Sequence, residues 1–335
     1  IRNKGILLFY CLLIFNITNA HDQEVHQYIV REAYKLLRAQ LNFDIPIMCD
    51  RIGYDETGNG PFNPGGLIVI GAFREDEEDI VWNVGTIPGI YVHVSVTHFW
   101  DADNGDNSQF CTNYCVLPDN MCYPNAYQKA LKFIYGGYEL KVYYPNIGII
   151  EAYEAPSYLP DYYKTGRIFY KGYYNIAGQF TPQNYWTTSP QRLRDKVVWE
   201  ILGRVAHLLA DVSVPAHVHN DQHDPICGGK DIFESWIKNN YYKWNYLDAL
   251  SSGGIINVVN LSNPIKYLFY TTAQIADHFP SNTIPGDNYS GINEPFSNYP
   301  PLQDIINNLP PTSPDDVSNI ANVTFVYAIR ATAGL

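Results

Sequence analysis

Apolar residues recur at helical spacing in several stretches of the chain. In the segment from His26 to Leu41, charged residues separate the apolar positions Ile29, Val30, Ala33, Leu36, Leu37 and Leu41. This pattern predicts an amphipathic helix. A second helix is expected between Ser189-Pro190, which is a good start signal, and Pro215. It is apolar around so much of its circumference that it should be central. Further helices are predicted over 232–246, 264–278 and 316–334.

The region between Trp100 and Ser189 follows a different pattern, dense in Tyr, Gly, Pro and Asn. Here we expect a helix near Ala126 to Tyr135, followed by loops and a small hairpin. With 335 residues and 46% apolar content, the chain is long enough to bury a full core. The predicted fold is therefore all-α, a mostly helical domain with a loop-rich, Tyr-rich insertion at about 105–188.

Residues 1–20 have the pattern of a secretory signal peptide. Arg2 and Lys4 precede an apolar run from Ile6 to Phe15, and small residues end at Ala20. The alternative is a buried helix or a membrane anchor, but the run is short for a bilayer span. We therefore expect cleavage after Ala20, a secreted protein (extracellular or periplasmic), and one domain over 21–335.

Charge and cysteine content narrow the possible partners. The formal charge is −12, and loss of the leader would make it more negative by two. No stable nucleic-acid complex is expected from such a balance. The close group Cys111, Cys115 and Cys122 favours a disulfide in an exported chain. A zinc site made of these thiols is the alternative, but it lacks a completing ligand pair.

Two polar residues interrupt the apolar central helix. His207 and Asp211 are four residues apart, so both side chains project from one face. A buried carboxylate needs compensation, which either a plain His–Asp hydrogen bond or a divalent cation would supply. His217 follows just past the expected helix end, and Asp231 and Glu234 share a face of the next predicted helix. Together these residues favour a metal site.

The run from Leu202 to His217 resembles the central H-x3-D-x5-H motif of the zinc-dependent phospholipase C family, whose fold is shared with the S1/P1 nucleases. Four further segments resemble that family's motifs. His26 stands at the head of an amphipathic helix, and His98 opens an H-F-W-D-x-D segment. Asp76 follows a glycine by five residues, and Glu234 stands early in a helix. The resemblance makes these four residues metal ligands. Glu75, beside Asp76, is the second choice for the aspartate.

The resemblance implies up to three Zn²⁺ ions. The first would be held by Asp76, His98, His207 and Asp211. The second would be held by Asp211 as a bridge, His26 and the backbone of His21, the first residue after cleavage. The third would be held by His217 and Glu234. Lys230 stands where the family has a further histidine, so the remaining ligand is expected from Asp231, or from His223 and Asp221. The closing segment 326–335 resembles the family's last helix, broken off early.

The resemblance also implies an activity. Phospholipase C-type enzymes cleave phospholipid phosphodiesters with a zinc-activated water, which Asp76 would orient or deprotonate. The expected partner is a phospholipid or other phosphodiester, met by a monomer through transient contact with a membrane surface. One alternative is an S1/P1-type single-strand nuclease or nucleotidase, because the five-residue spacing from His21 to His26 matches that branch. Another is a non-catalytic secreted zinc-binding protein.

Overall fold

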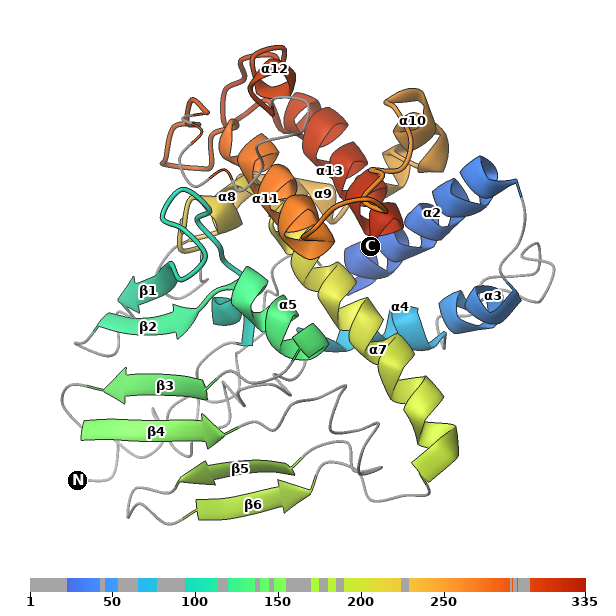
Figure 1. The fold of residues 1–335 in the computed structure, drawn as a ribbon. Coiled ribbons are helices and arrows are strands. Elements are labelled where there is room, and N and C mark those ends of the chain that lie inside the picture. Colours follow the sequence, from blue (N-terminus) through green and yellow to red (C-terminus); the bar gives the residue numbers. More distant parts are fainter. Residues whose placement is uncertain are drawn as a thin grey trace, which may run out of the picture.

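A computed structural model describes residues 23–42, 46–53, 66–76, 94–113, 120–135, 139–144, 148–154, 170–174, 180–184, 190–223, 229–289, 291, 294 and 302–335. The expected signal peptide and His21 lie outside these residues. The described chain is mostly helical (Figure 1), which confirms the predicted class.

The longest described helix, α7 (Pro190–Asp211), forms the centre of the helical part. α4 (Leu67–Arg74) and α5 (Ala126–Tyr135) pack against it, as do α2 (Gln23–Leu41) and α13 (Val317–Gly334). α13 also contacts α11 (Pro264–Asp277). The remaining helices are α3 (Pro46–Ile52), α8 (Pro215–Val218), α9 (Ile232–Ile237), α10 (Tyr246–Ser251) and α12 (Leu302–Ile306), with the 3-10 turns η1 (Val94–Thr97) and η2 (Tyr241–Lys243).

Two glycines allow α4 and α7 to touch through their backbones. A Cβ atom at Gly203 of α7 would lie 1.9 Å from the carbonyl oxygen of Ile68, and one at Gly71 of α4 would lie 2.0 Å from that of Glu200. Neither position has room for a side chain. The neighbour that approaches the backbone at Gly203 is therefore helix α4.

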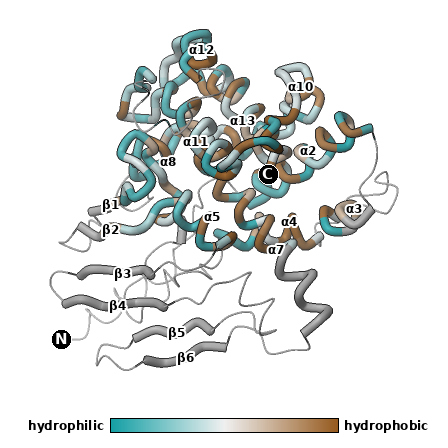
Figure 2. Tube along the Cα trace, in the orientation of Figure 1, coloured by the Kyte–Doolittle hydropathy of each residue, from teal (hydrophilic) through white to brown (hydrophobic). Residues whose placement is uncertain are grey.

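Apolar side chains fill the space between these helices. Figure 2 shows apolar stretches along α4, α7 and α13. One large cluster of buried residues includes Val205, Leu208 and Leu209 of α7 together with Phe269 and Phe325. Among the described residues, none of the helices has the length and apolar character needed to cross a bilayer.

The Tyr-rich region contains α5 where it was predicted, but more hairpin than expected. Three antiparallel pairs join β1 (Gln109–Asn113) to β2 (Asn120–Pro124), β3 (Glu139–Tyr144) to β4 (Gly148–Glu154), and β5 (Tyr170–Tyr174) to β6 (Phe180–Asn184). Cys111 and Cys122 are paired in register and form a disulfide, one of the pairings that the cysteine cluster allowed. In Figure 1 the six strands lie to one side of the helices.

The helix predicted over 232–246 is wrong in extent. It is replaced by α9 and η2, and α10 begins at Tyr246, where it was expected to end, because asparagines supply local caps. Asn240 donates from Nδ2 to the carbonyl of Trp236 (2.7 Å), at the end of α9. Asn245 accepts from the Leu247 amide (2.8 Å), and Asp248 accepts from the Asn245 amide, forming a capping box that starts α10.

Candidate metal centre

Helix α7 brings His207 and Asp211 together at the centre of the fold. The residues are one turn apart, and Nε2 of His207 lies 3.0 Å from Oδ2 of Asp211. Both side chains are fully buried. The paired projection that the sequence predicted is therefore present, inside the core.

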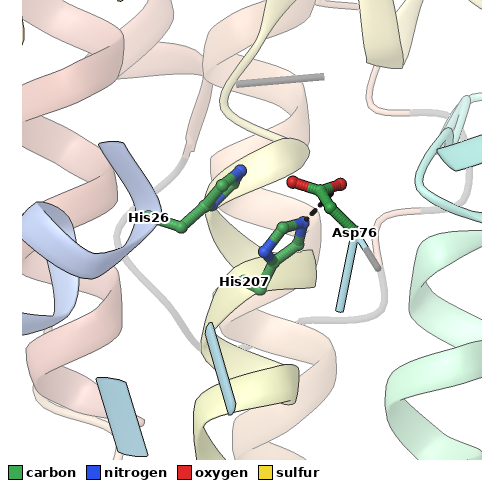
Figure 3. A group of neighbouring side chains, drawn as sticks. All are labelled: His26, Asp76 and His207. Atoms are coloured by element: carbon green, nitrogen blue, oxygen red, sulfur yellow. Dashed lines mark ion pairs between the residues drawn. The ribbon is translucent and has the colours of Figure 1, made fainter. Parts of the chain in front are cut away.

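Three other elements direct donors to the same place. His26 comes from α2, Asp76 follows the end of α4, and His98 follows η1. Figure 3 shows the imidazole of His26 and the carboxylate of Asp76 directed toward His207. The rings of His26 and His207 are stacked, with centroids 3.5 Å apart. Segments that are distant in the sequence thus meet at one buried position.

Four donor atoms in this group make short nitrogen–oxygen contacts with one another. His98 Nδ1 lies 2.9 Å from Asp211 Oδ2 and 3.6 Å from Asp76 Oδ1. His207 Nε2 lies 3.0 Å from Asp211 Oδ2 and 3.4 Å from Asp76 Oδ1. Ligands bound to one zinc ion at about 2.0–2.2 Å are about 3.3 Å apart in tetrahedral geometry. These four nitrogen–oxygen distances are close to that value. The donor atoms of His98, His207 and Asp211 lie within 4.8 Å of one another, as do those of His26, Asp76 and His207, so each group of three could hold a metal ion.

Asp211 presents its two oxygens to different neighbours. Oδ2 faces His98 and His207. Oδ1 lies 3.3 Å from Nε2 of His26 and 3.9 Å from Nδ1 of His217. One carboxylate is thus shared between two sets of imidazoles, which is the arrangement that a bridging ligand needs.

Several of the buried donor atoms lack a well-aligned hydrogen-bond partner. Among the described residues, no well-aligned hydrogen bond reaches either carboxylate oxygen of Asp76 or Asp211, or either ring nitrogen of His98 or His217. All four side chains are at most 4% exposed. Buried polar atoms without partners are costly, and a bound cation is the ordinary remedy. The residues therefore fit a metal ion by chemistry as well as by distance.

The electrostatics of the cluster favour the protonation states that metal binding needs. Burial lowers the pKa of His26 and of His98, which keeps both imidazoles neutral. Burial opposes ionisation of Asp211 and Asp76, but His207, His26 and His98 together outweigh it, and the pKa of both carboxyls lies below its usual value. The same two carboxylates raise the pKa of His207 against the effect of burial. A cation would take the place of the His207 proton.

Glu75, the second choice for the ligand aspartate, faces two buried cations instead. Its Oε1 lies 2.5 Å from Nζ of Lys129, and its Oε2 accepts a hydrogen bond from Nη1 of Arg204 at 2.8 Å. Oε1 also lies 3.9 Å from Nε2 of His98, on the side of the ring away from Asp211. Glu75 therefore supports His98 from outside the cluster. Lys129 was not singled out in the sequence, although its place among Ala126, Ala130 and Phe133 on one helix face signals burial.

A neighbouring group contains His217, His223 and Glu234, whose donor atoms lie within 4.8 Å of one another. His217 and Glu234 were predicted as partners, and Nε2 of His217 lies 3.1 Å from Oε1 of Glu234. The structure places Asp231 differently from the prediction. Its side chain accepts a hydrogen bond from the Glu234 amide and caps α9. Asp231 is thus engaged by its own helix.

A group of three carboxylates was missed in the sequence. Asp103, Asp277 and Asp287 could also hold a cation, with donor atoms within 4.8 Å of one another. His219 lies beside this group, with Nδ1 3.3 Å from Oδ1 of Asp277. Only Asp103 belongs to a recognisable motif. No local sequence signal could have joined it to two residues more than 170 positions away.

The chain was also compared with known proteins. No protein-family model matches it, and neither does any curated sequence. The case for its function therefore rests on the site described above and on the motifs in the sequence.

Proposed function

We propose that this protein is a secreted, zinc-dependent hydrolase of phosphate esters with the helical fold of the zinc-dependent phospholipase C family. The observation that carries the proposal is the convergence of buried donors from four separate elements on Asp211. His26, His98 and His207 lie against that carboxylate, and Asp76 faces the last two of these histidines. These are the residues that the motif resemblance selected. A chance set of family-like motifs would not be expected to meet in one buried place.

The donor set favours zinc over the other common divalent ions. Imidazole nitrogens and carboxylate oxygens together suit Zn²⁺ in a tetrahedral site. Calcium and magnesium take mainly oxygen ligands. The group formed by Asp76, His98, His207 and Asp211 offers two nitrogens and two oxygens, with nitrogen–oxygen distances of 2.9 to 3.6 Å between them. His26 and the second oxygen of Asp211 would bind a second zinc, together with the backbone of His21.

Zinc ions held here would neutralise charge on a phosphate group and lower the pKa of a water molecule near it. The protein would supply the proton acceptor. Both close contacts of Asp76 with the histidines use Oδ1, so Oδ2 is the atom that would orient the attacking water or take its proton. Burial of the ligands would keep bulk water from competing with these interactions.

Hydrolysis assays with and without a chelator test this proposal. We expect the purified protein to release phosphocholine from phosphatidylcholine vesicles, to lose this activity in EDTA, and to regain it with added Zn²⁺. The same preparations would be assayed on single-stranded DNA and on nucleoside monophosphates. A zinc-loaded protein that hydrolyses none of these phosphate esters would overturn the proposed function.

The second candidate is a nuclease or nucleotidase of the S1/P1 type. It is favoured by the five-residue spacing from His21 to His26. The H-F-W-D-x-D segment around His98 argues for the phospholipase instead. Chelator-sensitive turnover of nucleic acid or nucleotides alone would select the nuclease. Zinc binding without any turnover would select the third possibility, a secreted zinc-binding protein.

A further inference from the structure

Glu234 lies between two imidazoles that approach it from different segments. Its Oε1 lies 3.1 Å from Nε2 of His217, and its Oε2 lies 2.9 Å from Nε2 of His223. His217 is fully buried, and within the described chain neither of its ring nitrogens has a well-aligned hydrogen bond. The site therefore presents a polar side chain that needs a further partner, beside a second imidazole and a carboxylate.

His223 is held so that its Nε2 can act as a ligand. Its Nδ1 lies 2.9 Å from the carbonyl oxygen of Asp221. Because a carbonyl only accepts, Nδ1 must carry the proton in the neutral ring, which leaves the lone pair on Nε2. The same loop is tied down by the Ser281 hydroxyl, which donates to Oδ2 of Asp221 at 2.6 Å. A second tie joins Nε2 of His219 to the Phe279 carbonyl at 2.9 Å.

Lys230, which stands at the position of the family's histidine, is placed away from this site, and the candidate ligand Asp231 caps α9. Lys230 is exposed and precedes the cap of α9, so it lies outside the helix that carries Glu234. Asp231 accepts from the Glu234 amide at 2.7 Å through Oδ1. Using that oxygen for a metal would leave the start of α9 uncapped.

We propose that His223 is the third protein ligand of a separate zinc site, which it forms with His217 and Glu234. The inference rests on the proposed function, because it completes the same metal centre. Phe99 would cover one side of this site, since its ring stacks on that of His217 with centroids 4.5 Å apart. An apolar wall of this kind excludes competing water and strengthens binding.

Zinc binding by matched variants tests the assignment. The metal content of the full protein would be measured by mass spectrometry, and the affinities by competition with a chromophoric chelator, using Zn²⁺ alone. We expect His223→Ala to lose one zinc, or to bind it roughly 100-fold more weakly. Asp231→Asn keeps a capping side chain and should bind zinc as the native protein does. So should Lys230→Ala.

A second pair of measurements separates a lost ligand from a damaged fold. His223 is partly exposed, so His223→Asn should retain the native circular dichroism spectrum while losing the same zinc. With Co²⁺ in place of zinc, the visible absorption of this one site should disappear in both His223 variants. If Asp231→Asn loses the zinc and the His223 variants keep it, the assignment is overturned.

The outcome is independent of whether the protein proves to be a hydrolase. Loss of one zinc in the His223 variants of a protein that cleaves no phosphate ester would support the ligand assignment and overturn the function. Full zinc binding by the His223 variants of an active enzyme would support the function and overturn the ligand assignment. A native protein that binds no zinc at all would overturn both.

Discussion

Nδ1 of His207 lies 2.6 Å from the carbonyl oxygen of Ala72. Since the carbonyl can only accept, the neutral ring carries its proton on Nδ1 and directs the Nε2 lone pair toward Asp76 and Asp211. The backbone of α4 therefore sets both the tautomer and the orientation of a candidate metal ligand on α7. This contact between the two helices is possible because they approach each other so closely.

We expect Gly203→Ala to weaken both the fold and the zinc centre. The added methyl group would meet the backbone of Ile68 at 1.9 Å, so α4 would have to move away from α7. Overpacking of this kind costs about 1–3 kcal/mol, and the displaced Ala72 carbonyl would no longer hold His207. Urea unfolding and zinc competition would measure the two effects.

Ser318→Ala is a suitable control for that experiment, because Ser318 is an exposed residue of α13. Its stability should stay within about 0.5 kcal/mol of the native value. If Gly203→Ala matched the control in both stability and zinc affinity, the proposed role of the helix contact would be refuted.

Replacing Asp211 by Asn should remove activity and lower thermal stability together. Each oxygen of Asp211 faces a different set of imidazoles, so the substitution would loosen two zinc ions at once. A ligand present at 1,000 times its dissociation constant stabilises a protein by about 4 kcal/mol, and most of this should be lost. Thermal unfolding with zinc and with EDTA would show it.

The native protein should unfold at a clearly lower temperature in EDTA than in zinc, whereas Asp211→Asn should show only a small difference. Asp304→Asn, at an exposed carboxylate of α12, should behave as the native protein. Full activity in the Asp211 variant would show that the carboxylate does not bridge two metals.

The buried network around Arg204 predicts unequal effects of two similar substitutions. Glu75 contacts Lys129 at 2.5 Å and Arg204 at 2.8 Å, and all three are buried. Glu200 lies 3.4 Å from both Arg74 and Arg204, and the Arg74 side chain is 32% exposed. Removing one partner of a buried ion pair costs about 3–5 kcal/mol, whereas exposed pairs are worth about 1 kcal/mol or less.

Glu75→Gln should therefore destabilise the protein more than Glu200→Gln does in urea unfolding, because Glu75 contacts two fully buried cations at 2.5 and 2.8 Å, whereas Glu200 lies 3.4 Å from its two partners and one of them is partly exposed. It should also weaken zinc binding at His98, because Glu75 lies 3.9 Å from Nε2 of that ring. Equal costs for the two variants would contradict a stabilising role for the buried contacts of Glu75 with Lys129 and Arg204.

Apolar periodicity was sufficient to predict the long helices. α2, α11 and α13 begin and end within a few residues of their predicted limits, because α2 buries an apolar face and α11 and α13 bury runs of consecutive residues. Periodicity could not show where asparagine caps divide α9 from α10. The hairpins of the insertion were also underestimated, since their strands have few aliphatic residues to alternate with polar ones.

The donors of the metal centre were recognisable because their segments resemble known motifs. The partner of His217 and Glu234 was not, because Asp231, Asp221 and His223 are all close in sequence and only the path of the loop separates them. Lys129 was missed for a different reason. A buried lysine depends on a carboxylate 54 positions away, Glu75, to compensate its charge.

The stability of the protein should fall as the pH rises through the range in which Asp277 titrates. Burial, together with the nearby Asp103, Asp287 and Asp101, raises the pKa of Asp277 to about 8, whereas in the unfolded chain it is about 4. Between these values the folded protein holds a proton that the unfolded chain lacks. The contribution of the Asp277 proton to the free energy of unfolding is therefore fully present below pH 4 and is lost as the pH rises through 8.

Asp277→Asn should remove this dependence, because an amide is neutral throughout. His219, which faces Asp277 at 3.3 Å, is retained. Urea unfolding at pH 5 and pH 8.5, at saturating zinc and without calcium, would compare the variant with the native protein. At pH 8.5 the variant should have gained at least about 1.4 kcal/mol relative to the native protein, the equivalent of one unit of pKa difference. Asp304→Asn should show no such gain. A difference between Asp277→Asn and the native protein that is the same at both pH values would show that Asp277 is ionised throughout, so that the carboxylate cluster does not hold its proton.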